Sequence, residues 1–303
     1  MALIQMYKQI ILMLFSALGL YSYFETKFFK VSYSKIGNNN IRILHISDIH
    51  LYPFQKRKLK FIKKLNDKIN SKNKIDLIIS TGDNISSNKA ISILITTLAQ
   101  AGFDKIPGVF VFGSNDYYKP RISNPLKYFF GPSSRKKKYT NREKLDTDRL
   151  KKGFEFLGWK FVENNNVNLK IKNKNLSIIG GPDYHLPKNR IFYKNSINNH
   201  NSKNKPSQQN HLNLAVTHAP YLEVLNYFLN KNVNYIFSGH THGGQICLPK
   251  FGSFLTNCDL PREYSKGVFK VKNSYISISQ GLGTVAFFPF RFFCPPGVTI
   301  LEI

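Results

Sequence analysis

Acidic residues are scarce in this chain of 303 residues: 17 Asp and Glu accompany 44 Lys and Arg, which gives a formal net charge of +27. So large a positive charge suggests a nucleic acid or an anionic membrane as a partner. The lysines, however, are spread along the whole chain among Asn and Ile, as in NKIDLIIS. The charge therefore predicts a surface that attracts anions, and it disfavours a dedicated nucleic-acid site.

Cysteine is also scarce, and the three cysteines are Cys247, Cys258 and Cys294. Their number is odd, their spacing is wide and no C-x-x-C pair occurs. This pattern disfavours a disulfide scaffold and a zinc finger, and it favours thiols buried as small apolar side chains. All three follow the histidine-rich segment described below, which leaves open whether one of them lies near it.

The N-terminus carries an apolar run from Ile10 to Phe24 that is interrupted only by serine. Its length is at the lower limit for a membrane span. No small-x-small cleavage site follows the run, so an uncleaved membrane anchor is favoured over a signal peptide. More basic residues follow the run than precede it, and the positive-inside rule then places the body of the chain on the cytoplasmic side.

Short apolar runs and amphipathic segments alternate in the next part of the chain. Strands are predicted over 41–47, 75–80 and 109–112, and helices over 58–70 and 90–101. This order is typical of right-handed α/β crossovers in a sheet. The later chain is richer in strands, and two strand-rich halves with helices predict two sheets that face each other.

Two segments lack such periodicity. Residues 119–147 are basic and rich in Pro, Ser and aromatic residues, and they predict a large loop that is a candidate lid. Residues 189–210 are rich in Asn, Lys, Ser and Gln and predict a surface insertion.

Asp, His or Asn follows five of the predicted strands at the point where each strand ends. The residues concerned are Asp48, His50, Asp83, Asn115, His218, His240 and His242. Ligands bind at the carboxyl ends of strands in α/β sheets. One D-x-H or H-x-H would be weak evidence for a site, but five strand ends with the same chemistry predict one shared site.

Two carboxylates, several imidazoles and an amide form a mixed donor set that suits Zn²⁺, Mn²⁺ or Fe²⁺ better than Mg²⁺. The set is too large for one tetrahedral ion, whereas two ions about 3.5–4 Å apart, bridged by a carboxylate, would use all of it. Such a pair lowers the pKa of a shared water and holds a phosphoryl oxygen, so in-line attack on phosphorus becomes feasible. The sequence therefore predicts two divalent metal ions (Mn, Fe or Zn) as cofactors.

The motif series resembles that of the calcineurin-like metallophosphoesterases, which is D-x-H, G-D, G-N-H-D/E, H and G-H-x-H. The motifs occur here in this order and end in GHTHGGQ, and a GLG near the C-terminus is similar to the membrane-anchored branch of that family. The resemblance implies an α/β fold, a four-layer α/β/β/α sandwich of two mixed sheets, over residues 41–303. An anchor over residues 1–30 and a linker over 31–40 would precede it.

The resemblance also implies how the ions are held. Asp48, His50 and His242 would hold one ion and Asp83 would bridge both. His218 and His240 would hold the second ion together with an amide oxygen.

The third motif departs from the family pattern, because Gly113, Ser114, Asn115 and Asp116 stand where the family has Gly-Asn-His-Asp. A strict alignment gives the ligand position to Ser114, and a shift by one residue gives it to Asn115. An amide oxygen is a stronger acceptor for a cation than a hydroxyl, so we predict Asn115 as the metal ligand and as the catalytic residue of this motif. Asp116 is expected to orient the loop.

In either alignment the catalytic histidine of the family is missing. Its loss favours substrates whose leaving group needs little protonation, such as a phosphoanhydride or an aryl phosphate. His185, in GGPDYHLP, is a candidate substitute, although an exposed loop position is the simpler expectation for it.

These observations predict a membrane-anchored dimetal phosphoesterase that hydrolyses a phosphodiester or pyrophosphate bond, with a lipid-linked phosphate at the bilayer as the substrate hypothesis. Two alternatives stay open. The missing histidine would also suit a metal-binding protein of the same fold without catalysis. The net charge would suit an electrostatic binder of nucleic acid or anionic polymer, against which the motif series argues.

Overall fold

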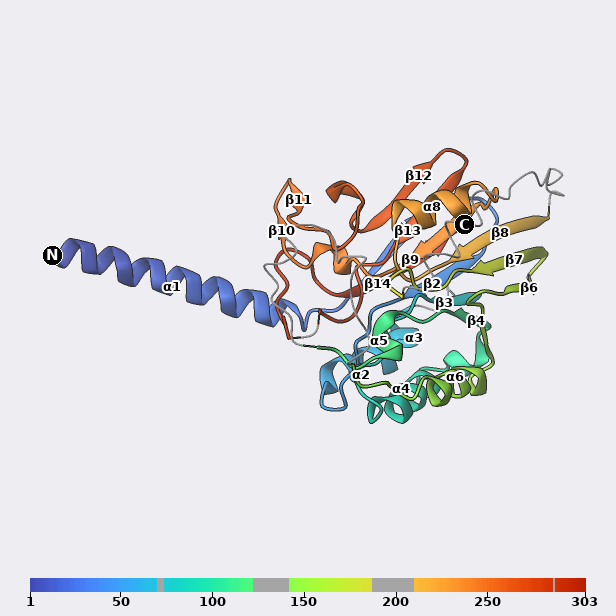
Figure 1. Ribbon diagram of the computed structural model, residues 1–303, viewed down its shortest axis with the longest axis horizontal. Coiled ribbons are helices and arrows are strands. Elements are labelled where there is room, and N and C mark those ends of the chain that lie inside the picture. Colours follow the sequence, from blue (N-terminus) through green and yellow to red (C-terminus); the bar gives the residue numbers. More distant parts are fainter. Residues whose placement is uncertain (70–73, 122–141, 187–209, 286) are drawn as a thin grey trace.

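Two six-stranded sheets form the centre of the molecule in the computed structural model, which describes residues 1–69, 74–121, 142–186, 210–285 and 287–303 (Figure 1). The first sheet contains, in order across it, β1 (Lys30–Lys35), β14 (Gly297–Glu302), β2 (Arg42–Ile46), β3 (Leu77–Ser80), β4 (Gly108–Phe110) and β5 (Trp159–Phe161). The second contains β12 (Gly267–Val271), β13 (Ser274–Ile278), β9 (Tyr235–Ser238), β8 (His211–Val216), β7 (Lys174–Gly180) and β6 (Asn166–Ile171). Most of the predicted lid loop and of the predicted insertion lies outside the described residues.

Helices cover the outer faces of both sheets. The first sheet is covered by α2 (Lys56–Lys63), α3 (Leu65–Lys68), α4 (Ala90–Gln100) and α6 (Thr147–Phe156), and the second by α8 (Leu222–Leu229) (Figure 1). Two shorter elements follow the ends of central strands. The single turn α5 (Ser114–Tyr117) comes after β4, and the hairpin of β10 (Cys247–Leu248) and β11 (Gly252–Ser253) comes after β9. The helix α1 (Ala2–Glu25) extends away from the rest of the chain (Figure 1).

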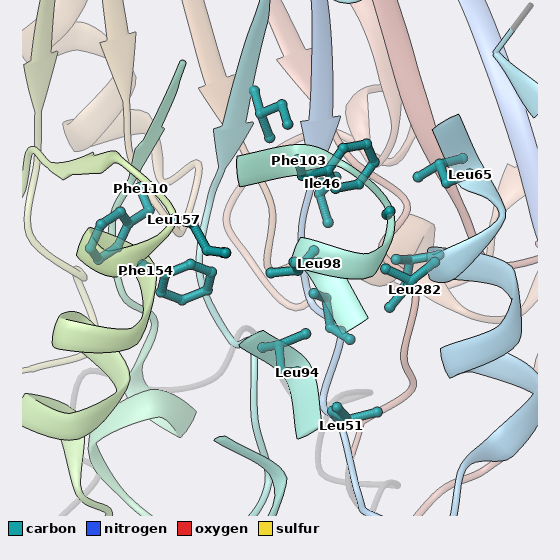
Figure 2. Packing of buried hydrophobic residues seen from close by; sticks show 14 of the residues in the cluster. Ile46, Leu51, Leu65, Leu94, Leu98, Phe103, Phe110, Phe154, Leu157 and Leu282 are labelled. Carbon is teal, nitrogen blue, oxygen red and sulfur yellow. The ribbon is translucent and has the colours of Figure 1, made fainter. Parts of the chain in front are cut away.

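Within the described residues, three apolar cores separate these layers. In β2, Leu44 and Ile46 pack against the helices of the first sheet, as Figure 2 shows for Ile46 near Leu94 and Leu98. Ile43 lies on the opposite face of β2 and packs into the core between the two sheets. The third core lies between the second sheet and α8. Because strands buried on both faces need apolar residues at successive positions, runs such as IRILHI form the central strands. The predicted four-layer sandwich is confirmed.

Parallel pairing brings the ends of the central strands together. In the first sheet β2, β3, β4 and β5 run parallel, and in the second sheet β7, β8 and β9 do. The antiparallel pairing of β14 with β2 makes the first sheet mixed. The residues that follow β2, β3, β4, β8 and β9 therefore meet at one end of the sandwich, which is where the sequence pattern predicts the site.

The predicted linker over residues 31–40 is wrong for its first half. Residues 30–35 form β1, which pairs in parallel with β14 from Lys30↔Gly297 to Lys35↔Glu302. The segment KVSYSK is too polar to be recognised as a buried strand, and its burial pattern is that of a half-exposed edge strand. The predicted helix over 58–70 is also interrupted, since α2 ends at Lys63 and α3 begins at Leu65.

The helix α1 contains one candidate membrane span among the described residues, Leu3–Glu25. None of its most apolar window is buried against the rest of the chain. Its length and composition suit a membrane anchor, and a signal sequence would have the same properties.

The aromatic packing under α6 predicts a stability difference between two phenylalanines of one helix. Phe154 is buried, with ring centroids 4.7 Å from Phe110 and 5.3 Å from Trp159. Phe156 is 85% exposed. Phe154→Ala should lower the free energy of unfolding by about 3–5 kcal/mol through the cavity it leaves. The matched variant Phe156→Ala should change it by less than about 0.5 kcal/mol. Urea unfolding of both variants measures the difference, and equal effects would contradict this description of the core.

Candidate metal centre

Two groups of buried side chains bring potential ligand atoms within 4.8 Å of one another. The first group is Asp48, His50 and His242, and the second is Asp48, Asp83 and His218. Asp83 Oδ2 lies 3.4 Å from His50 Nε2 in one group and 3.4 Å from His218 Nε2 in the other. Asp83 therefore lies between the imidazoles of the two groups, as a bridging carboxylate would.

His240 lies next to the second group. Its ring centroid is 5.3 Å from that of His218. Its Nε2 is 3.0 Å from the carbonyl oxygen of Asn257, which accepts a hydrogen bond when that nitrogen is protonated. This contact leaves Nδ1 as the ring nitrogen available to a cation.

Most of these residues adopt a left-handed backbone conformation that non-glycine residues rarely use. The residues and their φ angles are Asp48 (49°), His50 (44°), Asp83 (53°), His240 (70°) and His242 (52°). This conformation costs roughly 1–2 kcal/mol per residue. Strain gathered at five of the seven predicted ligands is typical of a functional site, where the surrounding fold maintains it.

Glycines at two strand ends allow the carboxylates to come close. A Cβ atom on Gly113 would lie 2.2 Å from Asp83 Oδ1, and one on Gly239 would lie 2.4 Å from Asp48 Oδ2. Any larger residue would push the carboxylates away from the histidines. The first residue of the G-S-N-D and G-H-T-H motifs must therefore be glycine, because a side chain there would collide with a carboxylate of the site.

Hydrogen bonds orient the carboxylate of Asp48 and the imidazole of His218. Asp48 Oδ2 accepts from the hydroxyl of Ser47 at 2.5 Å and from the backbone N–H of His240 at 2.9 Å. His218 Nδ1 donates to the carbonyl oxygen of Thr81 at 2.8 Å. These contacts direct the remaining atoms, Asp48 Oδ1 and His218 Nε2, toward the centre of the site.

The site contains buried polar atoms that lack a hydrogen-bond partner within the described ranges. They include Asp48 Oδ1, both ring nitrogens of His50, His218 Nε2 and His242 Nδ1. A buried polar atom without a partner is costly, and such atoms are rare in native proteins. All these atoms are carboxylate oxygens or imidazole nitrogens, which are the atom types that bind divalent ions. The residues therefore fit a metal centre.

Burial sets the protonation of the site. It lowers the pKa of His50 to about 4 and the pKa values of His240 and His242 well below the usual range, so these imidazoles are neutral. Burial raises the pKa of Asp48 to about 6. For Asp83, burial is outweighed by His218 and His50, which hold its pKa well below the usual range. For His218, burial is outweighed by the charge of Asp83, which holds the pKa of this imidazole well above its usual range. His218 is therefore protonated beside Asp83 and would release its proton on binding a metal ion, whereas the other three imidazoles are already neutral.

Asn115 lies beside the predicted bridge, as expected for a ligand position. Its backbone N–H donates to Asp83 Oδ1 at 2.9 Å and its amide nitrogen to Asp83 Oδ2 at 2.6 Å. Its amide oxygen accepts a hydrogen bond from Arg142 Nη2 at 3.0 Å. The amide oxygen therefore faces Arg142 and the amide nitrogen faces Asp83, so Asn115 would have to turn its amide to offer the oxygen to a cation. Arg142 is a residue near the site that the sequence analysis missed, since no motif marks it.

Asp116 holds the loop of the third motif in place. Its Oδ1 accepts from the backbone N–H of Asn84 at 2.7 Å and its Oδ2 from that of Gly113 at 3.1 Å. Burial and the charge of Asp83 raise the pKa of Asp116 to about 7. The expected role of Asp116 in orienting the loop agrees with these contacts.

His185 is not the exposed loop residue that the sequence suggested. Its side chain is buried, its Nδ1 is 2.8 Å from Asp183 Oδ1, and its Nε2 is 3.3 Å from the hydroxyl of Tyr221. Its ring centroid lies 4.2 Å from that of His240. The segment after β7 turns inward beside β8, which local sequence does not reveal.

Two of the three cysteines lie behind the G-H-T-H-G-G loop. The thiols of Cys247 and Cys294 donate to the carbonyl oxygen of Gly243 at 3.4 and 3.3 Å. Lys266 Nζ lies 3.5 Å from the first thiol and 3.4 Å from the second. All three cysteines are buried, and these two contact the loop backbone; neither belongs to the two ligand groups.

Comparison with known proteins agrees with this geometry. A model of the calcineurin-like phosphoesterase family matches residues 41–244. The chain belongs to the calcineurin-like phosphoesterase family. The matched segment contains all seven residues predicted as ligands and all five strand ends that meet at the site.

Two relatives come from Bacillus subtilis (strain 168). An uncharacterized metallophosphoesterase, YkuE, is 37% identical over 71 residues, which are 23% of this chain and 24% of that protein. The uncharacterized protein YpbG is 28% identical over 200 residues, which are 65% of this chain and 59% of that protein. The alignments thus span less than two thirds of either relative.

Solved structures of phosphoesterases are similar at low identity. A dimetal phosphatase from Danio rerio is 11% identical with a TM-score of 0.43, and the match covers 84% of this chain and 94% of that one. The phosphopantetheinyl hydrolase from Mycobacterium tuberculosis is 10% identical with a TM-score of 0.40, covering 80% of this chain and 89% of that one.

Metal content tests the two ligand groups separately. His50→Ala and His218→Ala should each reduce the metal bound per chain by about one ion of two, because each removes a neutral nitrogen donor from one group. His211→Ala, a histidine at the start of β8 outside both groups, is the matched control and should retain the wild-type content. Elemental analysis after metal loading gives the numbers. A wild-type content in His50→Ala or His218→Ala would contradict the assignment of that residue.

The third motif is tested by a pair of adjacent substitutions. Asn115→Ala should weaken binding of the second ion by about 10–100-fold, because Asn115 is the residue that contacts Asp83. Ser114→Ala should bind metal nearly as the wild type does. Competition with a fluorescent chelator measures both affinities, and the opposite order of effects would make Ser114 the ligand.

Proposed function

We propose that this chain is a dimetal phosphoesterase that hydrolyses a phosphodiester or pyrophosphate bond. The observation that carries the proposal is the overlap of two buried donor groups whose inward atoms lack hydrogen-bond partners in the described residues. The proposed ligands of the first ion are Asp48, His50 and His242, and those of the second are His218, His240 and Asn115. Asp83 is the proposed bridge, and Asp48, which belongs to both groups, lies close enough to assist it.

When bound, two divalent ions supply activation of a water for attack on phosphorus and neutralisation of charge on the phosphoryl oxygens. The chain holds the donors in place before binding, through the backbone contacts of Asp48, His218 and Asp116. The mixed nitrogen and oxygen donors favour Mn, Fe or Zn. Preorganised donors of this kind reduce the reorganisation that the reaction requires.

The missing histidine of the third motif restricts the substrate. Asn115 cannot protonate a leaving group, and the Arg142 guanidinium beside it keeps its proton at any ordinary pH. Arg142 adds a positive charge that suits a phosphate oxygen. We therefore propose substrates whose leaving group is stable as an anion, such as a phosphoanhydride or an aryl phosphate.

We further propose a lipid-linked phosphate or pyrophosphate as the natural substrate, and α1 as a membrane anchor. The exposed apolar helix and the basic surface support this proposal. Vesicle-embedded lipid pyrophosphates should be hydrolysed faster than soluble nucleotides at equal phosphate concentration. Activity confined to soluble mononucleotides would contradict the lipid-linked substrate. The cytoplasmic side of the membrane stays a prediction from the charge distribution.

Metal dependence tests the catalytic proposal against the non-catalytic alternative. Full-length protein stripped of metal should not hydrolyse an aryl phosphodiester with an activated leaving group, and Mn²⁺ should restore turnover. Asp83→Asn should lower turnover by at least about 100-fold, since it removes the charge of the proposed bridge. Asp104→Asn, an exposed carboxylate far from the motifs, is the control.

Three outcomes separate the alternatives. Turnover that requires metal and Asp83 supports the enzyme. Two bound ions without turnover of aryl, pyrophosphate or lipid-linked substrates would favour a metal-binding protein. Binding to nucleic acid that survives metal removal and falls steeply with salt would favour the electrostatic binder.

A further inference from the structure

Exposed apolar side chains gather near the end of α1. Leu248, Phe251 and Phe254 come from the β10–β11 hairpin, and Phe287 and Phe293 come from the segment before β14. Phe251 is 83% exposed and Phe287 is 58% exposed. We call these five residues the proximal patch. Exposed apolar residues in one region of a surface usually contact a partner or a membrane.

The last turns of α1 contact the segment before β14 directly. The ring of Tyr21 lies 5.6 Å from that of Phe292 and 5.9 Å from that of Phe293. The carbonyl oxygen of Ser22 accepts a hydrogen bond from the backbone N–H of Arg291 at 2.9 Å. The patch therefore lies beside the point where α1 leaves the domain, as Figure 1 shows for the hairpin.

The carboxylate of Glu25 strengthens this junction. It is buried and accepts hydrogen bonds from the backbone N–H groups of Phe293 at 2.8 Å and Cys294 at 2.7 Å. The same segment holds the hairpin, because the carbonyl oxygen of Phe292 accepts from the N–H of Cys247 at 2.8 Å. Charged hydrogen bonds of this kind fix α1 relative to the hairpin.

The junction continues into the metal centre through Arg291. Its buried guanidinium donates to the carbonyl oxygens of His242 at 3.2 Å, Gln280 at 2.8 Å and Gly283 at 3.0 Å. The N–H of Gly283 in turn donates to the carbonyl oxygen of Asp48 at 2.6 Å. One residue thus connects the end of α1 with two of the loops that carry predicted ligands.

We propose that the proximal patch inserts into the headgroup region of the same bilayer that α1 enters. The domain then lies against the membrane, with its metal centre held at a constant height above it. Phe and Leu side chains on a membrane-facing surface bury themselves at the boundary between headgroups and acyl chains. The exposed Lys250 next to Phe251, and Lys27, whose Nζ lies 3.7 Å from the Tyr23 ring centroid, suit anionic headgroups.

This inference rests on the proposed anchoring of α1 and makes the proposed lipid-linked substrate accessible without leaving the bilayer. It commits to lipid as the occupant because the patch continues the surface of an apolar helix. A protein partner on the patch is an alternative outcome of the test below.

Fluorescence quenching by lipid tests the patch without using catalysis. The three native cysteines are buried, so single surface cysteines can be labelled with an environment-sensitive dye. Full-length Phe251→Cys and Phe287→Cys would be reconstituted into phosphatidylcholine and phosphatidylglycerol vesicles that carry a nitroxide near the headgroup. Leu12→Cys in α1, with a nitroxide deep in the acyl chain, reports the anchor. Phe156→Cys is the matched control, because it is an equally exposed phenylalanine on α6 across the domain.

We expect both patch labels to lose most of their emission and the Phe156→Cys label to retain it. Quenching at Leu12→Cys without quenching at either patch site would overturn the patch and leave the anchor intact. Patch labels that are shielded from aqueous iodide but not quenched by lipid would indicate a protein or intramolecular partner and overturn the proposal as well. No quenching at any site would overturn the patch together with the anchor, whatever the phosphoesterase assay shows.

Discussion

The burial of carboxylates and imidazoles between strand ends is the constraint on which the site depends. Asp48 and Asp83 are withdrawn from water at the end of the sandwich, beside His50 and His218. An isolated buried charge costs several kcal/mol, and a divalent cation offsets that cost where donors surround it. The strand ends approach one another closely. This close approach accounts for the left-handed backbone of the predicted ligands, and it leaves no room for a side chain at Gly113 or Gly239.

The sandwich makes this approach possible. Parallel strands of two facing sheets end at one side, so residues nearly two hundred positions apart, such as Asp48 and His240, come within hydrogen-bond distance. The three apolar cores hold the sheets and helices in place and thereby fix the positions of the loops. The backbone strain at the predicted ligands is thus balanced by packing elsewhere in the domain.

The chemistry of the third motif and the position of α1 together narrow the kind of substrate that suits the site. Where the family pattern has an acid, this chain has the neutral amide of Asn115 beside the permanent cation of Arg142. This pair suits a charged phosphate that carries a good leaving group. Arg291 connects the last turn of α1 with the loop of His242. The proposed membrane anchor and the proposed metal centre are therefore linked by one set of hydrogen bonds.

By itself the sequence determined the family, the four-layer fold and the seven residues that meet at one end of the sandwich. The family and the fold followed from the resemblance of the motif series, and the shared site followed from local rules: apolar runs make strands, and polar residues after them lie at one edge. Only the tertiary structure decided that residues 30–35 join a sheet, that His185 is buried beside His240, and that Cys247 and Cys294 lie behind the G-H-T-H-G-G loop. The direction of the Asn115 amide and the role of Arg142 also depend on contacts between distant segments. Such contacts are set by strand order and loop packing, which periodicity and spacing along one chain do not encode.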